Sequence, residues 1–94
     1  MAYALIRASV RDYDEWKPVF DELSSLRQKH GSKGTRVFRA KDSPNEVVVL
    51  TQFSDEGEAR RMFQSEEFLA GTKKGGVTAP PEVEFLEEVD SQSA

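Results

Sequence analysis

The longest block of large aliphatic side chains lies in the middle of the chain, where residues 46–53 read EVVVLTQF. In a β-strand, successive side chains point to opposite faces. Val47 and Val49 therefore share one face of this predicted strand. Val48 and Leu50 share the other face. Both faces are apolar, so the pattern predicts a strand that is covered on both sides.

Three other segments show the alternation that is typical of strands, and they span residues 3–12, 35–42 and 82–89. The sequence SPNE at 43–46 has the composition of a turn. It predicts a hairpin between the second of these strands and the central strand at 47–53. The tail DSQSA is expected to fray.

A first helix is predicted after the first strand, because apolar residues recur at spacings of three and four at Trp16, Val19, Phe20, Leu23 and Leu26. Asp12 is a suitable N-cap, and Glu15 follows at the spacing of a capping box. Pro18 stands late for a helix start, which predicts a distorted entry or a later cap. Gly31 and Gly34 are predicted to end the helix.

A second helix is predicted after the central strand, with Ser54 as its cap and acidic residues in the first turn, where the helix dipole favours them. Its apolar stripe consists of Ala59, Met62 and Phe63. Phe68 falls opposite this stripe at about 100° per residue. The helix is therefore expected to break near Ser65, which can cap a short further turn. The Gly- and Pro-rich residues 70–81 are predicted to be a connection.

The predicted order is β-α-β-β-α-β, which indicates an α+β, ferredoxin-like fold: a four-stranded antiparallel sheet with both helices on one face. The chain is predicted to be a single domain over 1–94, with its ordered core at about 3–89. Such a fold leaves the second face of the sheet bare. The apolar side chains on that face predict a homodimer in which two open sheet faces pack together. The alternative is a monomer with a mildly apolar open face.

Composition limits the function classes that remain. The chain has 94 residues and a net charge of −4, and its basic residues are scattered apart from two short pairs, so the sequence argues against a nucleic-acid partner. The absence of cysteine excludes disulfides, thiolate catalysis and zinc–thiolate sites. No segment approaches the roughly 20 apolar residues of a membrane span, and the N-terminus does not read as a signal peptide. A soluble, cytoplasmic protein without a membrane partner is predicted.

His30 is the only histidine and the first candidate for catalysis. Counted from Trp16 at about 100° per residue, it falls near the centre of the apolar stripe, and Arg27 lies within roughly 60° of it. The two side chains are candidates for binding an anion or moving a proton in a cavity between helix and sheet. The alternative is structural, since basic residues in a last turn offset the helix dipole.

Aromatic residues supply the candidates for ligand binding. Trp16, Tyr13 and Phe20 lie close enough on the first helix to form the wall of a pocket for a flat organic molecule, although such residues also serve as plain core. Phe38, which shares a face of the second strand with Arg36, is a further candidate. One histidine without cysteine is too little for a metal site, and no metal or cofactor is predicted.

Two stretches carry a resemblance to a known group of proteins: VRDYDEWKPVFDE, and VFRAKDSPNEVVVLTQFSDEGEARRMFQSEEFLAGTKKGGV. They resemble small proteins of the dimeric α+β barrel superfamily, and most of all its cyclase-like and antibiotic-biosynthesis-monooxygenase-like members. The resemblance spans about residues 3–89. It implies a ferredoxin-like homodimer with a cavity between sheet and helices in each subunit. Some relatives oxygenate polyketide-type aromatics without a cofactor, and others degrade haem or cyclise polyketides.

The sequence departs from the pattern of the haem-degrading relatives. They have an asparagine on the first strand, a tryptophan near the end of the third and a histidine on the second helix. Here the first strand has no asparagine, Phe53 ends the third strand, and the second helix has no histidine. The resemblance therefore gives no support for haem.

These observations predict a homodimer that binds a small apolar or aromatic molecule beside Trp16. The enzymatic hypothesis is a cofactor-independent monooxygenase or cyclase acting on a polycyclic or quinol-like substrate. In that hypothesis His30 or Arg27 steadies a developing oxyanion. The alternative is a non-catalytic binding or accessory protein whose cavity is filled by its own side chains.

Overall fold

The structure is a computed structural model that describes residues 2–93. Met1 and Ala94, the limits of the predicted domain, lie outside the described residues. Eight elements follow one another along the chain: β1 (Ala2–Ser9), α1 (Tyr13–Glu22), α2 (Ser24–Lys29), β2 (Ser32–Ala40), β3 (Ser43–Phe53), α3 (Glu56–Gln64), α4 (Glu66–Lys74) and β4 (Glu82–Leu86).

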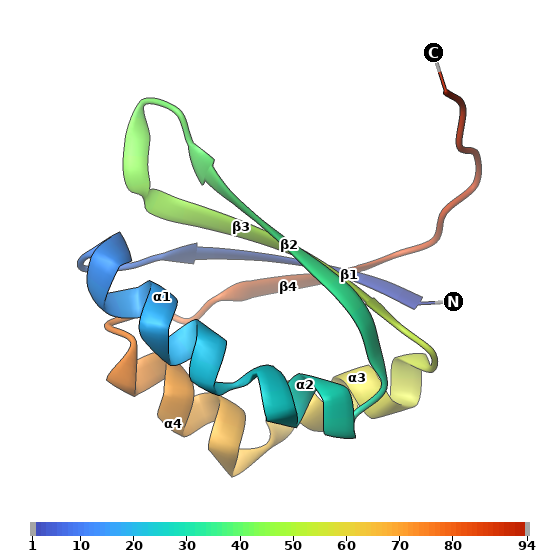
Figure 1. The fold of residues 1–94 in the computed structure, drawn as a ribbon, viewed down its shortest axis with the longest axis horizontal. Coiled ribbons are helices and arrows are strands. Elements are labelled where there is room, and N and C mark those ends of the chain that lie inside the picture. Colours follow the sequence, from blue (N-terminus) through green and yellow to red (C-terminus); the bar gives the residue numbers. More distant parts are fainter. Residues whose placement is uncertain (1, 94) are drawn as a thin grey trace.

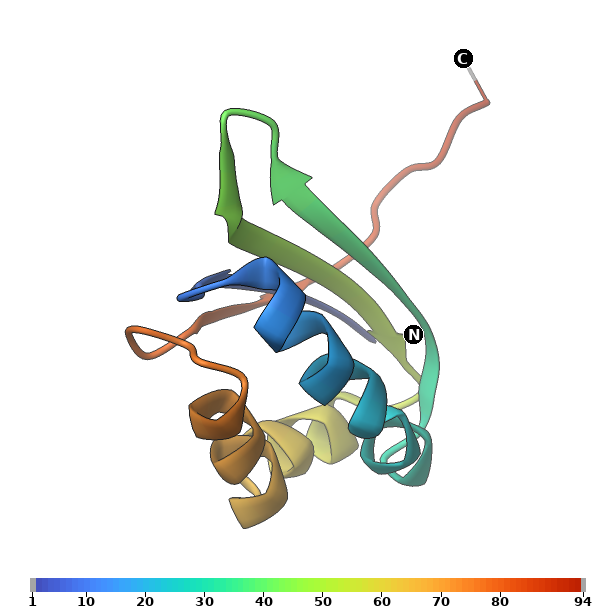
Figure 2. The same cartoon turned by 60° about the vertical axis from the view of Figure 1, so that its left-hand side comes forward.

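The four strands form one antiparallel sheet in the order β2-β3-β1-β4. All four helices lie on the same side of this sheet, and the segment after β4 leaves the body on the far side (Figure 1). Figure 2 shows the same two layers, one of helices and one of strands, and the end of the β2–β3 hairpin that extends beyond them. The predicted α+β, ferredoxin-like fold is confirmed. Within residues 2–93, no helix is long and apolar enough to cross a membrane.

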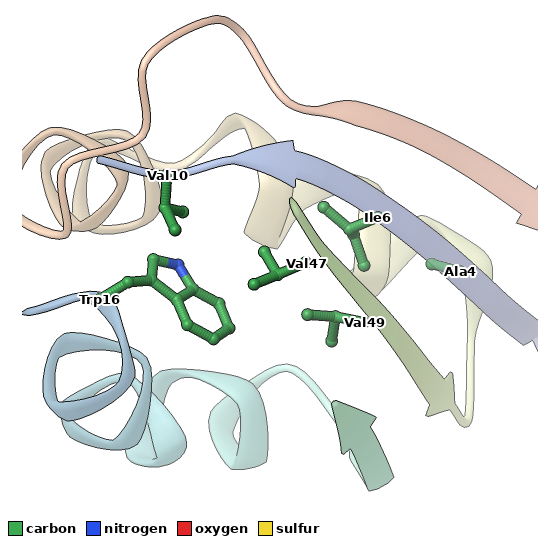
Figure 3. Packing of buried hydrophobic residues seen from close by; sticks show 6 residues of the cluster. All are labelled: Ala4, Ile6, Val10, Trp16, Val47 and Val49. Atoms are coloured by element: carbon green, nitrogen blue, oxygen red, sulfur yellow. The ribbon is translucent and has the colours of Figure 1, made fainter. Parts of the chain in front are cut away.

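The two sides of the sheet differ in burial as the alternation predicts. On the helix side, Val47, Val49 and Thr51 of β3 are 1%, 6% and 2% exposed. They pack with Ala4 and Ile6 of β1, as Figure 3 shows for the apolar members of the cluster. On the other side, termed here the open face, Val48 and Leu50 are only half-buried, because no helix of the described chain covers them.

The β2–β3 hairpin is tighter than predicted. SPNE was expected to form its turn, but Ser43 and the residues after it belong to β3, and Lys41 and Asp42 make the turn. Asn45, a residue of the predicted turn, instead accepts two hydrogen bonds at this end of the sheet. Its carbonyl accepts the backbone N–H of Val10, and its side chain accepts that of Tyr13. Strand pairing and these bonds together outweigh the local turn preference of the sequence.

Asp12 caps α1 as predicted, and its side chain accepts the backbone N–H of Asp14. The expectation of a later cap is therefore wrong, and the helix runs through Pro18 to Glu22. The capping box is incomplete because the Glu15 carboxylate binds the Arg11 guanidinium instead.

The first helix is not continuous as predicted. It breaks at Leu23, whose N–H is shared between the carbonyls of Val19 and Phe20 at 3.2 Å each, and α2 follows. Gly31 ends α2 with a φ of 85°, a conformation that glycine adopts without strain. Gly34, the other predicted terminator, lies within β2.

The second helical region also differs at both ends. Asp55, not Ser54, is the N-cap of α3, and it accepts the N–H of Glu58. The predicted break at Ser65 is confirmed, and its hydroxyl accepts the N–H of Phe68. The expected short turn is a nine-residue helix, α4, so much of the predicted connection at 70–81 is helical.

Candidate functional site

A cavity lies between the helical layer and the buried face of the sheet. The inner part that can hold water has a volume of about 70 Å³, and the empty space is about 700 Å³ when the open mouth is counted. Because one water needs roughly 10–15 Å³ of the smaller volume, the inner part has room for several water molecules. The wall is formed by Ile6, Ala8, Trp16, Val19, Phe20, Leu23, Leu26, Arg27, Val47, Val49, Thr51, Met62, Phe63, Phe68, Gly71, Thr72, Val77 and Pro81.

Almost all of this wall is apolar. The Thr51 hydroxyl lies 3.3 Å from the Gly34 carbonyl and 3.2 Å from the Thr35 hydroxyl, and the Thr72 hydroxyl donates to the Leu69 carbonyl. Both threonines therefore have partners inside the protein. Among residues 2–93, the wall includes no histidine, aspartate, glutamate or lysine, and Arg27 is its single charged side chain.

Arg27 is held in place by two contacts with one residue. Its guanidinium carbon lies 3.9 Å from the centre of the Phe20 ring, and Nη1 donates to the Phe20 carbonyl at 2.9 Å. Burial of the side chain lowers the pKa of Arg27, and the charge of Asp21 opposes this in part. The guanidinium has five N–H donors, and within residues 2–93 the bond to Phe20 is its one hydrogen bond. The remaining donors are available to an anionic group.

The aromatic residues predicted on α1 are brought together, though not all of them face the cavity. Trp16 is 8% exposed and points from α1 toward Val47 of the sheet (Figure 3). Its ring centre lies 4.9 Å from that of Phe20, and both side chains line the cavity. The ring centre of Tyr13 lies 5.8 Å from that of Trp16, and Tyr13 is not part of the wall.

The opposite wall comes from α3 and α4 and was not predicted as part of a site. The ring of Phe63 lies edge-on to Phe68, with centres 5.2 Å apart, and both line the cavity with Met62. The sequence did indicate that Met62 and Phe63 face inward, because both belong to the apolar stripe of α3. Gly71 and Thr72 were missed because their segment was interpreted as a connection rather than as helix.

His30 does not line the cavity. Its Nδ1 lies 3.1 Å from a Glu58 carboxylate oxygen, at the junction of α2 and α3. Glu58 also accepts a hydrogen bond from Arg61. Those two hydrogen bonds, first from Arg61 and then from His30, lower the pKa of Glu58. The helical count placed His30 on the apolar stripe because it assumed one continuous helix, and the break at Leu23 removes that assumption.

Phe38 also lies away from the cavity. Val37 packs against the core, so Phe38 points to the open face, where it is 50% exposed. Of the six predicted site residues, the structure therefore brings Trp16, Phe20 and Arg27 to one cavity. It does not bring Tyr13, His30 or Phe38 there.

The geometry limits what this cavity can do. An apolar wall with one cation suits a flat apolar molecule that carries a single negative oxygen. A charge interaction is strengthened where water is excluded. A proton acceptor would have to be water or a group of the ligand, because the described wall residues offer no carboxylate or imidazole.

Comparison with known protein families identifies one family, described as antibiotic biosynthesis monooxygenase, whose pattern matches residues 2–74. The match spans most of the chain, from β1 to the end of α4. The chain belongs to the antibiotic biosynthesis monooxygenase family. No curated protein sequence matches it.

Solved structures similar to this family member have the same fold. The cofactor-independent oxygenase SnoaB from Streptomyces nogalater superposes with a TM-score of 0.81 at 18% identity, over 99% of this chain and 97% of SnoaB. A protein from Bordetella bronchiseptica gives a TM-score of 0.78 at 16% identity, over 94% of this chain and 96% of the other. At these identities the likeness establishes the fold alone.

Proposed function

We propose that this protein is a cofactor-independent monooxygenase that binds a quinol-like or polycyclic hydroxyaromatic substrate in the cavity. One observation carries the proposal. The half-buried guanidinium of Arg27 lies in a wall that is otherwise apolar or occupied by internally bonded threonines. A cation in such a place is costly unless its remaining donors meet an anion. A hydroxyaromatic anion supplies both the flat apolar body and the single negative oxygen.

In the proposed reaction the substrate loses a proton and becomes an electron-rich anion that dioxygen can oxidise. One oxygen atom of O₂ becomes the new carbonyl oxygen at a substrate CH₂ group, and the other leaves as water with the two hydrogens of that group. Arg27 stabilises the anion, which lowers the pKa of the substrate within the site. Trp16 and Phe20 hold its flat apolar body by van der Waals contact.

The size of the cavity bears on the substrate. Its inner part has room for a single ring, and the larger space lies at the open mouth. A substrate with several fused rings would therefore extend through the mouth between helices and sheet. The family membership and the name of SnoaB, a cofactor-independent oxygenase, support this class of reaction for the chain.

A second candidate follows from the same wall. The described wall residues contain no carboxylate or imidazole, and the cavity therefore also suits a binding site without catalysis. In that case the protein holds or delivers an anionic aromatic molecule as an accessory protein. A cyclase would use the same stabilised anion and consume no oxygen.

We also propose that the protein is a homodimer formed through the open face. Leu5, Val48 and Leu50 are half-buried there, and Phe38 and Leu86 are 50% and 38% exposed. A row of apolar side chains on a sheet face without helices marks an interaction site. A second copy supplies the same kind of surface by symmetry.

Oxygen consumption with an anthrone, which has the CH₂ group that the proposed reaction oxidises, tests the proposal. Wild type is expected to consume one O₂ per anthrone oxidised, and Arg27→Gln to lose most of this rate. His30→Ala is the matched control and should retain it, because His30 lies outside the cavity. Tight binding that depends on Arg27 without oxygen uptake would instead establish the accessory function. A rate equal in wild type and Arg27→Gln would overturn the role of Arg27.

A further inference from the structure

Trp16 brings to the cavity a hydrogen-bond donor that the rest of the described chain leaves unused. Its indole Nε1–H can donate one hydrogen bond and can accept none. Within residues 2–93, the hydrogen bonds of the side chains include none from this nitrogen. A buried tryptophan usually has a partner for its N–H. Because Trp16 is only 8% exposed, the unused donor is unusual.

The indole nitrogen keeps some open surface although the side chain is buried. Residues 2–93 contain no side-chain nitrogen or oxygen that is completely buried without a hydrogen-bond partner. An unpartnered Nε1 must therefore border open space, and the space that Trp16 lines is the cavity. Figure 3 shows this nitrogen on the side of the indole that faces Val10 and Val47, two side chains that cannot accept a hydrogen bond. The donor is thus available to a molecule in the cavity.

Gly75 leaves the same edge of the indole uncovered. A methyl group at this position would lie 3.1 Å from Cδ1 of Trp16, the carbon bonded to Nε1, and 3.2 Å from the Gly71 carbonyl oxygen. The φ of Gly75 is −76°, which any residue can adopt, so the backbone conformation does not require glycine. The close approach to Trp16 disfavours a larger residue instead, and the missing side chain keeps the surroundings of Nε1 clear.

The unused donor lies close to the cation of the cavity. The ring centres of Trp16 and Phe20 are 4.9 Å apart, and the Arg27 guanidinium carbon is 3.9 Å from the centre of the Phe20 ring. Phe20 therefore contacts both residues, and one fused-ring molecule can reach both donors. The hydroxyls of Thr51 and Thr72 already have partners inside the protein, so they do not compete for this role.

We infer that the Trp16 N–H is a second hydrogen-bond donor for the substrate and selects aromatic anions that carry a second, neutral oxygen. The inference rests on the proposed function and adds a specificity-determining residue to it. Arg27 binds the negative oxygen, and Trp16 donates to a carbonyl or hydroxyl oxygen elsewhere on the rings. Anthrone suits this pair of donors, because its CH₂ group lies across the central ring from its oxygen. The oxidised product therefore carries an acceptor oxygen at both positions.

Replacement of a single group of atoms tests the inference. Trp16 is the only tryptophan, so a tryptophan analogue supplied during expression enters the chain at this position alone. In benzothienylalanine, sulfur replaces the N–H and the two fused rings are kept. The probe is the anion of 2-hydroxy-1,4-naphthoquinone, which has neutral carbonyl oxygens, and naphtholate, which has none, is the matched ligand. In isothermal titration calorimetry, loss of the N–H is expected to weaken binding of the quinone anion about threefold to tenfold and to leave that of naphtholate unchanged.

5-Fluorotryptophan retains the N–H and is the conservative counterpart, which should restore the affinity for the quinone anion. Equal losses for both ligands would show that Trp16 acts through shape, and an unchanged affinity for the quinone anion would show that it donates no hydrogen bond. Either result would overturn the inference. If quinone binding depends on the N–H but the protein consumes no oxygen with anthrone, the proposed oxygenase is overturned and the second donor stands. A protein that binds neither anion would overturn both.

Discussion

The Arg27 guanidinium lies over the Phe20 ring, with its carbon 3.9 Å from the ring centre, and donates to the carbonyl of the same residue at 2.9 Å. Stacking and hydrogen bonding together fix a charge at the cavity wall. Arginine suits this position because its planar group can stack and donate at once, whereas lysine is a point charge on a flexible stem.

Replacement of Arg27 is therefore expected to weaken the binding of an anionic aromatic molecule. A hydrogen bond to a charged group contributes about 1.5–3 kcal/mol, so Arg27→Gln should reduce the affinity for a naphtholate by about 10- to 100-fold. Arg27→Lys should recover only part of the loss. Quenching of Trp16 fluorescence, the only tryptophan, measures both constants. Naphthalene is the neutral control, and an equal loss of affinity for it would show that the substitution acts through shape rather than charge.

Leu50→Glu should separate the subunits. The substitution places a carboxylate in the middle of the open face, where the proposed partner would remove it from water without a counter-charge. The dissociation constant measured by sedimentation equilibrium is expected to rise by about 100-fold or more. Leu69→Glu is the matched control, because Leu69 is 52% exposed on α4. A Leu50→Glu variant that sediments as wild type does would contradict dimerisation through this face.

Gly71→Ala should change the cavity more than the stability. A methyl group at Gly71 would lie 2.7 Å from Cδ1 of Leu23, and both residues line the cavity, so the leucine must shift. Alanine favours the helix by about 1 kcal/mol, which offsets part of the crowding. We expect a small change in the free energy of unfolding and about tenfold weaker naphtholate binding. Gly34→Ala, which meets nothing within 4 Å, should leave binding unchanged.

Ser65→Ala should destabilise the protein by about 1 kcal/mol, because it removes the side-chain cap at the start of α4. Ser65→Asp should recover only part of that loss, since aspartate is an equally good cap but cannot donate to the Met62 carbonyl as the serine hydroxyl does. Urea denaturation provides the measurement. Ser54→Ala is the control, because Asp55 caps α3 instead, and its effect should stay within about 0.5 kcal/mol. Equal effects at Ser54 and Ser65 would mean that capping does not explain the loss.

The stabilising effect of Glu58 should depend on pH. Hydrogen bonds from Arg61 and His30 lower its pKa in the folded state below that of the unfolded chain, which is about 4.3. Its contribution is therefore complete above that value and is lost as the pH falls through the folded pKa. Thermal unfolding of wild type and Glu58→Gln should differ at pH 7 and converge in acid. A constant difference from pH 7 to pH 3 would contradict this linkage.

The hydrophobic pattern alone determined the sheet and its two faces. Alternation assigned Val47 and Val49 to the core and Val48 and Leu50 to the open face, because side-chain direction in a strand follows from the backbone with a period of two. Two helix boundaries were also predictable from neighbouring residues alone. Asp12 and Ser65 cap helices through hydrogen bonds to residues two or three positions away.

The cavity was only partly predictable. Trp16 and Phe20 were found from their spacing on one helix, but Phe63, Phe68 and Gly71 reach the same wall from other helices. No local sequence pattern indicates which helices pack against one another. The error at His30 has a related cause, since a count of 100° per residue holds only within one unbroken helix.

The sequence by itself determined which residues are apolar, how they alternate, and hence the class of fold. Tertiary structure decided where helices break and which side chains share a space. The break at Leu23 turns His30 toward Glu58 and leaves Arg27 against Phe20 in the cavity. Packing of distant segments sets these positions, and its energy depends on contacts that are formed only when the whole chain is folded.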